Sequence, residues 1–410
     1  MTTEQRFEAC LGYLHARIRN TMTTRPRPRI ALVFGVGVLL LGLAFGVGWA
    51  AGRLQPSQLS GFPILNEALR LIRDHYLGDL PDGEALGRGM IRGLLQALGD
   101  PYTVLVEPAA RELETDQLTG SYGGIGADLT RDSSGGLHLI PYPGGPADRA
   151  GIREGDALVS VDGHSLSAGT PLEQVTAWLR GPTGSPVRVA FIGADGGTRD
   201  IRLVRETYKL PSVTSYLLPD DDQILVVRIS LFSETTSGEV DRAVESGTDR
   251  GARFLILDLR GNPGGLLEAG VDTARLFLAD GLIASERRSD GTVTTYHAEA
   301  PGRWESLPLA IVVDGGTASA AEILAAALRR PDDAPLVGQP TLGKGSVQSI
   351  FPLRDGSSLH LTTAVWIMPD GQTLEAGGLA PDFSVAPESE DPDAAVKAAA
   401  RLLRETDAGS

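Results

Sequence analysis

The fold is decided by the stretch Phe254-Leu-Ile-Leu-Asp-Leu-Arg-Gly-Asn-Pro-Gly-Gly-Leu-Leu-Glu-Ala-Gly-Val-Asp-Thr-Ala-Arg-Leu-Phe-Leu278. Its first part, Phe254–Leu259, is a short apolar run of the kind found in buried strands. A glycine-rich loop, Arg260–Gly265, follows, and Leu266–Leu278 then repeats apolar residues at helical spacing. Strand, loop and helix in this order predict an α/β architecture with a partly parallel sheet.

The same pattern recurs on both sides of this stretch. Ile224–Ile229 and Leu309–Val313 are further apolar runs that predict buried strands, and Ala318–Arg329 predicts a helix after the second of them. In α/β proteins the loops at the carboxyl ends of parallel strands carry the chemistry. The turn after Val313 is therefore a candidate active-site segment.

Two segments near this turn carry reactive side chains: Gly315-Gly-Thr-Ala-Ser319-Ala-Ala-Glu322 and Gly343-Lys344-Gly-Ser-Val-Gln348. Only three of the 37 basic residues are lysines, and lysine, unlike arginine, loses its proton when it is buried. A serine beside a neutral lysine is a nucleophile with its own base. We interpret Ser319 as the nucleophile, Lys344 as the base and Gln348 as the side chain that orients the lysine.

Backbone amides of the same region are candidates for an oxyanion hole. The N–H of Ala320 lies at a predicted helix start, and the turn Gly264–Gly265 exposes further N–H groups. Structural alternatives remain open for each motif: Ser319 as a simple helix cap, Lys344 as a solvated turn residue, and the glycine-rich loop as a plain strand-to-helix turn.

The composition restricts the function classes. The 410-residue chain has a net charge of −15, which argues against a nucleic-acid partner because such a partner needs a basic surface. The single cysteine, Cys10, excludes an intramolecular disulfide and a cysteine-based zinc site. The six histidines do not have metal-ligand spacing. We therefore expect neither a metal site nor a cofactor.

Residues Ile30–Ala51 form an uncharged apolar run long enough to cross a bilayer. Arginines are concentrated before the run, so the positive-inside rule places the N-terminal segment 1–29 in the cytoplasm. A cleaved signal peptide is the alternative, with Gly48 and Ala50 as small residues near a cleavage site. We favour an uncleaved single-pass anchor in the plasma membrane, and either interpretation puts the remainder outside the cytoplasm, on the periplasmic or extracellular side.

After a short tether, 52–61, the region 62–117 begins with apolar residues at helical spacing from Phe62 to Leu98. The Gly78–Gly83 turn divides this pattern, which predicts a helical hairpin. The apolar stripe of the hairpin must be buried against the core or against a second subunit. The second option predicts a homodimer.

Residues 118–206 predict a compact, partly open β-domain of short strands and two small helices. It starts with a loop containing Tyr122, Gly123, Gly124, Ile125 and Gly126. Backbone N–H groups in such a loop can bind the terminal carboxylate of a peptide that adds to a sheet edge. A plain glycine turn is the alternative.

Taken together, these motifs resemble the carboxyl-terminal processing proteases, also called tail-specific proteases. The resemblance extends from about Phe62 to Val385 and includes Gly155-Asp-Ala-Leu-Val-Ser-Val-Asp-Gly163, Asp258–Gly265, the two dyad segments and Gly377-Gly-Leu-Ala-Pro-Asp382. It departs from the family at Asp314, where Asn is frequent, and at Thr317 and Ala321, where Ser is frequent. Asp314 would raise the lysine pKa if it pointed into the site.

The resemblance implies an α/β (α+β) protease core, 207–386, with an inserted PDZ domain and a C-terminal helix and tail, 387–410. It implies a serine endopeptidase that acts on proteins or peptides with accessible C-termini. Arg205, at the junction of the PDZ domain and the core, is the candidate residue for coupling the two. A catalytically silent, membrane-tethered PDZ adaptor is the alternative function, and an acyltransferase or esterase with the same dyad is a third.

Overall fold

The computed structural model describes residues 62–330, 334–374, 377–386 and 391–409. The predicted anchor, 30–51, and the segments 1–29 and 52–61 around it lie outside these residues. Among the helices that the structure does describe, we find none with the length and apolar character that crossing a membrane requires. The chain divides between Asp82 and Gly83 into two units, each of which is described by itself.

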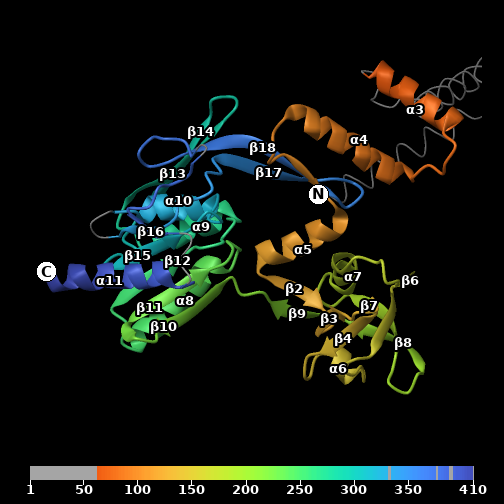
Figure 1. Ribbon diagram of the computed structural model, residues 1–410, viewed down its shortest axis with the longest axis horizontal. Helices are drawn as coiled ribbons and strands as arrows, with labels where there is room; N and C mark the ends of the chain where they lie inside the picture. Colours follow the sequence, from red (N-terminus) through yellow and green to blue (C-terminus); the bar gives the residue numbers. More distant parts are fainter. Residues whose placement is uncertain (1–61, 331–333, 375–376, 387–390, 410) are drawn as a thin grey trace, which may run out of the picture. The chain divides into compact units, whose positions relative to one another are not determined.

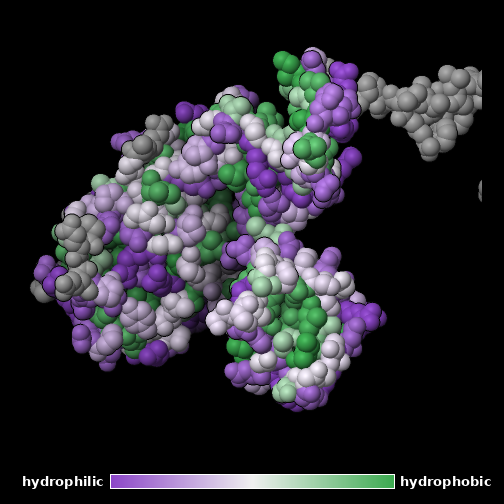
Figure 2. Space-filling view, turned by 45° about the vertical axis from the view of Figure 1, so that its right-hand side comes forward, coloured by the Kyte–Doolittle hydropathy of each residue, from purple (hydrophilic) through white to green (hydrophobic). Residues whose placement is uncertain are grey.

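The first unit contains α3 (Pro63–His75), which begins with a proline at its first turn, where a missing N–H costs nothing. Several of its apolar side chains are exposed, including Ile64, Leu71 and Ile72. Figure 2 shows green, hydrophobic residues at the surface of the segment that adjoins the grey chain. The second unit opens with α4 (Gly83–Leu98). The two predicted helices are confirmed, whereas their pairing as a hairpin stays a prediction.

The framework of the second unit is a six-stranded sheet (Figure 1). In spatial order its strands are β10 (Val213–Leu218), β11 (Asp221–Ile229), β12 (Phe254–Asp258), β15 (Leu309–Val313), β16 (Leu336–Gly338) and β19 (Phe383–Ser384). The pair β10–β11 is antiparallel and the other neighbours are parallel. The predicted partly parallel sheet is confirmed.

Both faces of this sheet are covered by helices, as its continuous apolar strands require. Leu225 and Val227 belong to the core cluster shared with α8 (Thr236–Asp249), α9 (Leu267–Arg275) and α10 (Ala320–Leu328). Ile224 and Val226 point to the other face and pack with α11 (Ala394–Gly409). The alternation along β11 thus anchors α9 and α10, whose N-terminal ends carry the candidate site.

A second, antiparallel sheet supplies the other wall of the site. Its path is β1 (Val104–Val106), β18 (Ser358–Ile367), β13 (Gly281–Arg288) and β14 (Val293–Ala298), with β17 (Ser346–Pro352) also paired to β18. Strand β1 has only three residues, and β13, β14 and β18 mix polar and apolar residues, so no long apolar run reveals these strands.

The β-domain has its own core and its own sheet (Figure 1). The sheet order is β3 (Ala127–Arg131), β4 (Leu137–Pro141), β5 (Ala157–Val161), β7 (Pro186–Ile192) and β8 (Thr198–Val204), with β6 (His164–Ser165) paired to β5 and with helices α6 (Pro146–Arg149) and α7 (Leu172–Leu179). The entry strand β2 (Ser121–Gly124) pairs with the exit strand β9 (Glu206–Lys209). Strand β3 is an edge strand, as peptide addition to the sheet would require.

Helix α5 (Pro108–Thr119) contacts both the β-domain and the core. Its Asp116 forms an ion pair with Arg180 of the β-domain at 3.2 Å. In its last turn, the Leu118 carbonyl accepts a hydrogen bond from the Glu234 amide of the core at 2.8 Å. The helix ends at Gly120 in the left-handed region, with φ of 71°.

Candidate active site

Ser319 lies between β15 and α10, at the predicted strand-to-helix turn. It occupies the N-cap position of α10 with φ of 54° and ψ of −121°, which is a strained conformation for a residue with a side chain. Gly264 approaches it so closely that a Cβ at Gly264 would lie 2.7 Å from the Ser319 Cβ. Strain and close approach of this kind are found at functional sites, and they fix the direction of the serine side chain.

Hydrogen bonds tie this turn to the glycine-rich loop after β12. The Asp314 carboxylate accepts the amide N–H groups of Gly261 at 2.8 Å and Gly316 at 2.9 Å. The Ala318 amide donates to the Asn262 carbonyl at 2.9 Å. Asp314 therefore stabilises the turn between β15 and α10. The expectation that it raises the lysine pKa is not supported, because it is not among the carboxylates that act on Lys344.

The three oxyanion candidates differ in availability. Ala320, in the first turn of α10, and Gly265 both line the cavity beside Ser319. The Gly264 amide instead donates to the side-chain oxygen of Asn262 at 2.8 Å. In this structure the Ala320 and Gly265 N–H groups are free to meet a developing oxyanion, and Gly264 acts through the space that it leaves for Ser319.

Lys344 lies just before β17 and makes the contact that the sequence predicts. Its Nζ donates to Gln348 Oε1 at 2.8 Å. The Gln348 amide in turn donates to the backbone carbonyl of Tyr102 at 3.0 Å, and the Lys344 ammonium lies 5.3 Å from the centre of the Tyr102 ring. The sequence pattern does not predict a role for Tyr102. Its carbonyl holds the Gln348 side chain, which in turn orients Lys344.

Burial lowers the pKa of Lys344 below its ordinary value, because a buried site disfavours the charged ammonium. The carboxylates of Glu114, Asp100 and Glu322 oppose this shift. Gln348 is a neutral acceptor, so it orients the amine without adding to the opposing charge. The net shift of the Lys344 pKa is downward, toward the neutral amine that a general base requires.

Glu322 joins the two dyad segments. The sequence pattern places it in the serine motif but does not predict this role. It is completely buried, and its carboxylate accepts four hydrogen bonds. The donors are the Ser319 amide at 2.9 Å, the Lys344 amide at 3.0 Å, the Gly343 amide at 2.8 Å and the Thr341 hydroxyl at 2.5 Å. A buried carboxylate with four donors is well satisfied, and here it holds the lysine loop against the start of α10.

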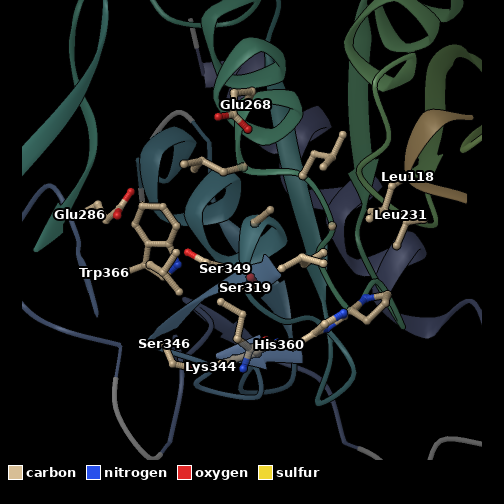
Figure 3. Close-up of a pocket in the computed structure, with 18 of the residues that line it drawn as sticks. Leu118, Leu231, Glu268, Glu286, Ser319, Lys344, Ser346, Ser349, His360 and Trp366 are labelled. Atoms are coloured by element: carbon tan, nitrogen blue, oxygen red, sulfur yellow. Dashed lines mark hydrogen bonds between the residues drawn. The ribbon is translucent and has the colours of Figure 1, made fainter. Parts of the chain in front are cut away.

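Ser319 and Lys344 line one cavity of about 550 Å³ (Figure 3). Within the described contacts, Lys344 Nζ donates to Gln348 and has no hydrogen bond to Ser319. His360 of β18 and Glu114 of α5 also line the cavity and form an ion pair at 3.3 Å if the imidazole is protonated. The arrangement offers a nucleophile, a half-buried amine and backbone donors to one bound peptide bond.

Comparison with known proteins agrees with this geometry. Residues 223–385 match peptidase family S41, and residues 141–192 match the PDZ domain. The chain is 36% identical over 323 residues to the carboxy-terminal processing protease CtpA of Bacillus subtilis (strain 168), covering 78% of this chain and 68% of that protein. This chain belongs to the carboxy-terminal processing proteases of peptidase family S41. It is therefore a serine-type peptidase.

Two further similarities lie within the same family. The chain is 34% identical over 334 residues to the chloroplastic C-terminal processing peptidase of Tetradesmus obliquus, covering 77% of this chain and 72% of that protein. Among solved structures, the photosystem II D1 C-terminal processing protease is 32% identical, covers 82% of this chain and 90% of its own, and has a TM-score of 0.46.

The β-domain that includes the PDZ match, 141–192, begins with the loop predicted to bind peptides. Tyr122, Gly123 and Gly124 lie in β2, and Ile125 is buried in the domain core. Gly126 has φ of 70° and leads into edge strand β3. In the described part of the chain, the amides of Ile125 and Gly126 have no hydrogen-bond acceptor. Two adjacent free N–H groups at the start of an edge strand are what binding of a carboxylate requires.

Arg205 is buried at the end of the PDZ domain. Its guanidinium donates to the carbonyl oxygens of Leu179 at 3.0 Å and Trp178 at 2.8 Å, which are orphan acceptors at the end of α7. Burial lowers the pKa of Arg205, and the charges of Asp162 and then of Glu112 on α5 oppose that shift. Arg205 thus holds α7 and lies within electrostatic reach of α5. Its role in coupling stays a prediction.

No group of three or more potential metal ligands occurs among the residues that the structure describes.

Proposed function

We propose that this S41 peptidase is a membrane-anchored, extracytoplasmic endopeptidase that cleaves peptide bonds with a Ser319–Lys344 dyad and selects substrates by their carboxyl termini. The observation that carries the dyad is the shared cavity, in which a half-buried Lys344 with a lowered pKa lies beside a strained Ser319. Family membership favours the peptidase over the silent PDZ adaptor.

In the proposed reaction, Ser319 Oγ attacks the scissile carbonyl carbon while neutral Lys344 takes the hydroxyl proton. Gln348 accepts one amine N–H, which directs the lone pair of Nζ toward the serine. The Ala320 and Gly265 amides stabilise the oxyanion of the tetrahedral intermediate. Lys344 returns the proton to the departing amine, and water, deprotonated by the same lysine, then hydrolyses the acyl-enzyme.

Substrate selection would use the free amides of Ile125 and Gly126 for the terminal carboxylate, with the peptide adding along β3. Peptide binding to the PDZ domain would affect the cavity through helix α5. This helix carries Asp116, which pairs with Arg180 of the PDZ domain, and Glu114, which lines the cavity. Arg205 would contribute by holding α7 beside α5.

The test of the dyad is digestion of an unfolded protein by the purified full chain in detergent, with a metal chelator present. Ser319→Ala and Lys344→Arg should both lose cleavage while they keep the parent's circular dichroism. The arginine variant keeps the positive charge but cannot act as a base at neutral pH. Cleavage by either variant at the parent rate would refute the dyad.

The apolar run Ile30–Ala51 and the arginines before it support the proposed anchor and topology. Cys10 is the only cysteine and is predicted to be cytoplasmic. A membrane-impermeant thiol reagent should therefore leave Cys10 unlabelled in intact cells. The same reagent should label Glu405→Cys, at an exposed position of α11, in a Cys10→Ser background. Labelling of Cys10 in intact cells would overturn the topology.

A homodimer through the N-terminal helical region is the last part of the proposal. Its support is the set of exposed apolar side chains on α3, which lose contact with water when a second copy covers them. Sedimentation of the parent and of Ile64→Ser/Leu71→Ser tests it. A monomeric parent would remove this part and leave the dyad untouched.

A further inference from the structure

The cavity of the dyad extends to a wall that neither the dyad nor the oxyanion donors use. Glu286 of β13 and Trp366 of β18 are cross-strand partners and both line the cavity. The ring of Tyr296 on β14 packs edge-on against Trp366, with the ring centres 6.4 Å apart. Figure 3 shows Trp366 and Glu286 on one side of Ser319, with Lys344 and Ser346 below it.

This wall contains two unused hydrogen-bond donors. Trp366 is 2% exposed and its indole N–H has no acceptor, and the hydroxyl of Ser346 is also buried without a partner. Within the described residues, these are the two buried side-chain polar atoms that lack a partner. Both residues line the cavity. Buried donors are nearly always satisfied in proteins, so two of them in one cavity indicate a group that arrives with the substrate.

The same wall also offers an acceptor whose charge is already balanced. Glu286 is 6% exposed and accepts hydrogen bonds from Arg288 Nε at 3.1 Å and from the Tyr296 hydroxyl at 3.3 Å. Because Arg288 pairs with it, the carboxylate does not need a cation from the substrate. It keeps lone pairs that can accept from a neutral donor.

We propose that this wall is a specificity subsite for an uncharged polar side chain, a hydroxyl or a carboxamide, on a residue next to the scissile bond. Such side chains supply an acceptor for the Trp366 indole and the Ser346 hydroxyl, and a donor for Glu286. An aliphatic side chain of the same shape leaves the Trp366 and Ser346 donors unsatisfied, and a site with unsatisfied buried groups discriminates against it. The proposal rests on the proposed proteolytic function of Ser319.

The test uses peptides that differ at one residue on either side of the cleaved bond, in the near-isosteric pairs Thr/Val and Asn/Leu. The full chain should prefer the polar member by roughly tenfold in kcat/KM at one of the two positions, as expected for a hydrogen bond to a buried donor. Trp366→Phe keeps an aromatic ring, although a smaller one, and removes the indole N–H, so it should abolish most of this preference. Ser346→Ala should reduce it independently, which keeps the proposal testable if the Trp366 variant does not fold.

Trp304→Phe is the matched control. The Trp304 indole donates to Asp241 at 2.8 Å, and this tryptophan is not part of the cavity wall. This variant should keep the parent's preference. Equal rates for both members of each pair would overturn the subsite. So would a preference that survives in Trp366→Phe/Ser346→Ala, or a stronger preference for lysine at the same position.

Binding of the same peptides to Ser319→Ala separates this proposal from the proposed function. The Thr peptide should bind more tightly than the Val peptide, and Trp366→Phe in this background should remove the difference. Discrimination in binding without cleavage by the parent would support the subsite and reject the proteolytic function. Equal binding of all pairs would reject the subsite, whatever the parent cleaves.

Discussion

The Glu322 carboxylate binds the backbone amide of Lys344 at 3.0 Å, and the same oxygen binds the amide of Ser319 at 2.9 Å. One buried side chain thereby fixes the distance between the backbone of the nucleophile and the backbone of the base. The geometry of the dyad depends on this bridge more than on any contact between the two reactive side chains.

Glu322→Gln should lower both stability and kcat. The new amide NH₂ replaces an acceptor oxygen and faces backbone N–H donors, which leaves buried donors unpaired at a cost of about 1–3 kcal/mol. Urea unfolding and steady-state kinetics measure the two effects. Glu305→Gln, at an exposed position, is the control and should change neither. Parent stability and kcat in Glu322→Gln would contradict the bridging role.

The pH dependence of kcat/KM should have an acidic limb that belongs to Lys344. Activity requires the neutral amine, so it should rise as pH increases through the lysine pKa, which burial places below the ordinary 10.5. Glu114 raises this pKa, so Glu114→Gln should shift the limb to lower pH. Glu112→Gln on the same helix is the matched control. A limb that stays in place in Glu114→Gln would refute the assignment.

Gln348→Glu should shift the same limb in the opposite direction. A carboxylate at 2.8 Å from Nζ stabilises the ammonium and raises the lysine pKa, so activity at neutral pH should fall and partly recover at higher pH. Gln348→Met removes the hydrogen bond without adding charge. It should lower kcat without the upward shift. Identical pH profiles for the two variants would show that Gln348 does not control the charge state of Lys344.

These contacts show which parts of the site a sequence pattern can predict. The strand-loop-helix order and the pair Lys344–Gln348 are local, so spacing is enough to predict them. Gln348 contacts Tyr102 across 246 positions, and Glu322 is joined to Lys344 only after both chain segments fold. The strands that carry Glu286 and Trp366 are not continuous apolar runs like the core strands, so the pattern that predicts the core sheet does not reveal the wall that they build.

Gly264→Ala should inactivate and destabilise the enzyme. The added Cβ would lie 2.7 Å from the Ser319 Cβ and 2.9 Å from the Ala318 carbonyl, in a backbone conformation with φ of 103°. Gly261→Ala is the matched control, because it has φ of 69° but open space around the new Cβ. Backbone strain alone costs about 1 kcal/mol. Gly264→Ala should lose clearly more stability than this in urea unfolding, together with its activity.

The PDZ loop should bind the substrate carboxylate directly. A peptide with a free C-terminus should be cleaved with at least about tenfold higher kcat/KM than its amidated form, mainly through KM, because the hydrogen bonds to a carboxylate are charge-assisted. Gly126→Ala should remove this difference, since its Cβ would collide with the Tyr208 hydroxyl at a φ of 70°. Gly196→Ala, at φ of 76° in open space of the same domain, should keep it. If the parent cleaves both peptides equally, the loop does not read the terminus, and selection must lie in the cavity around Ser319 alone.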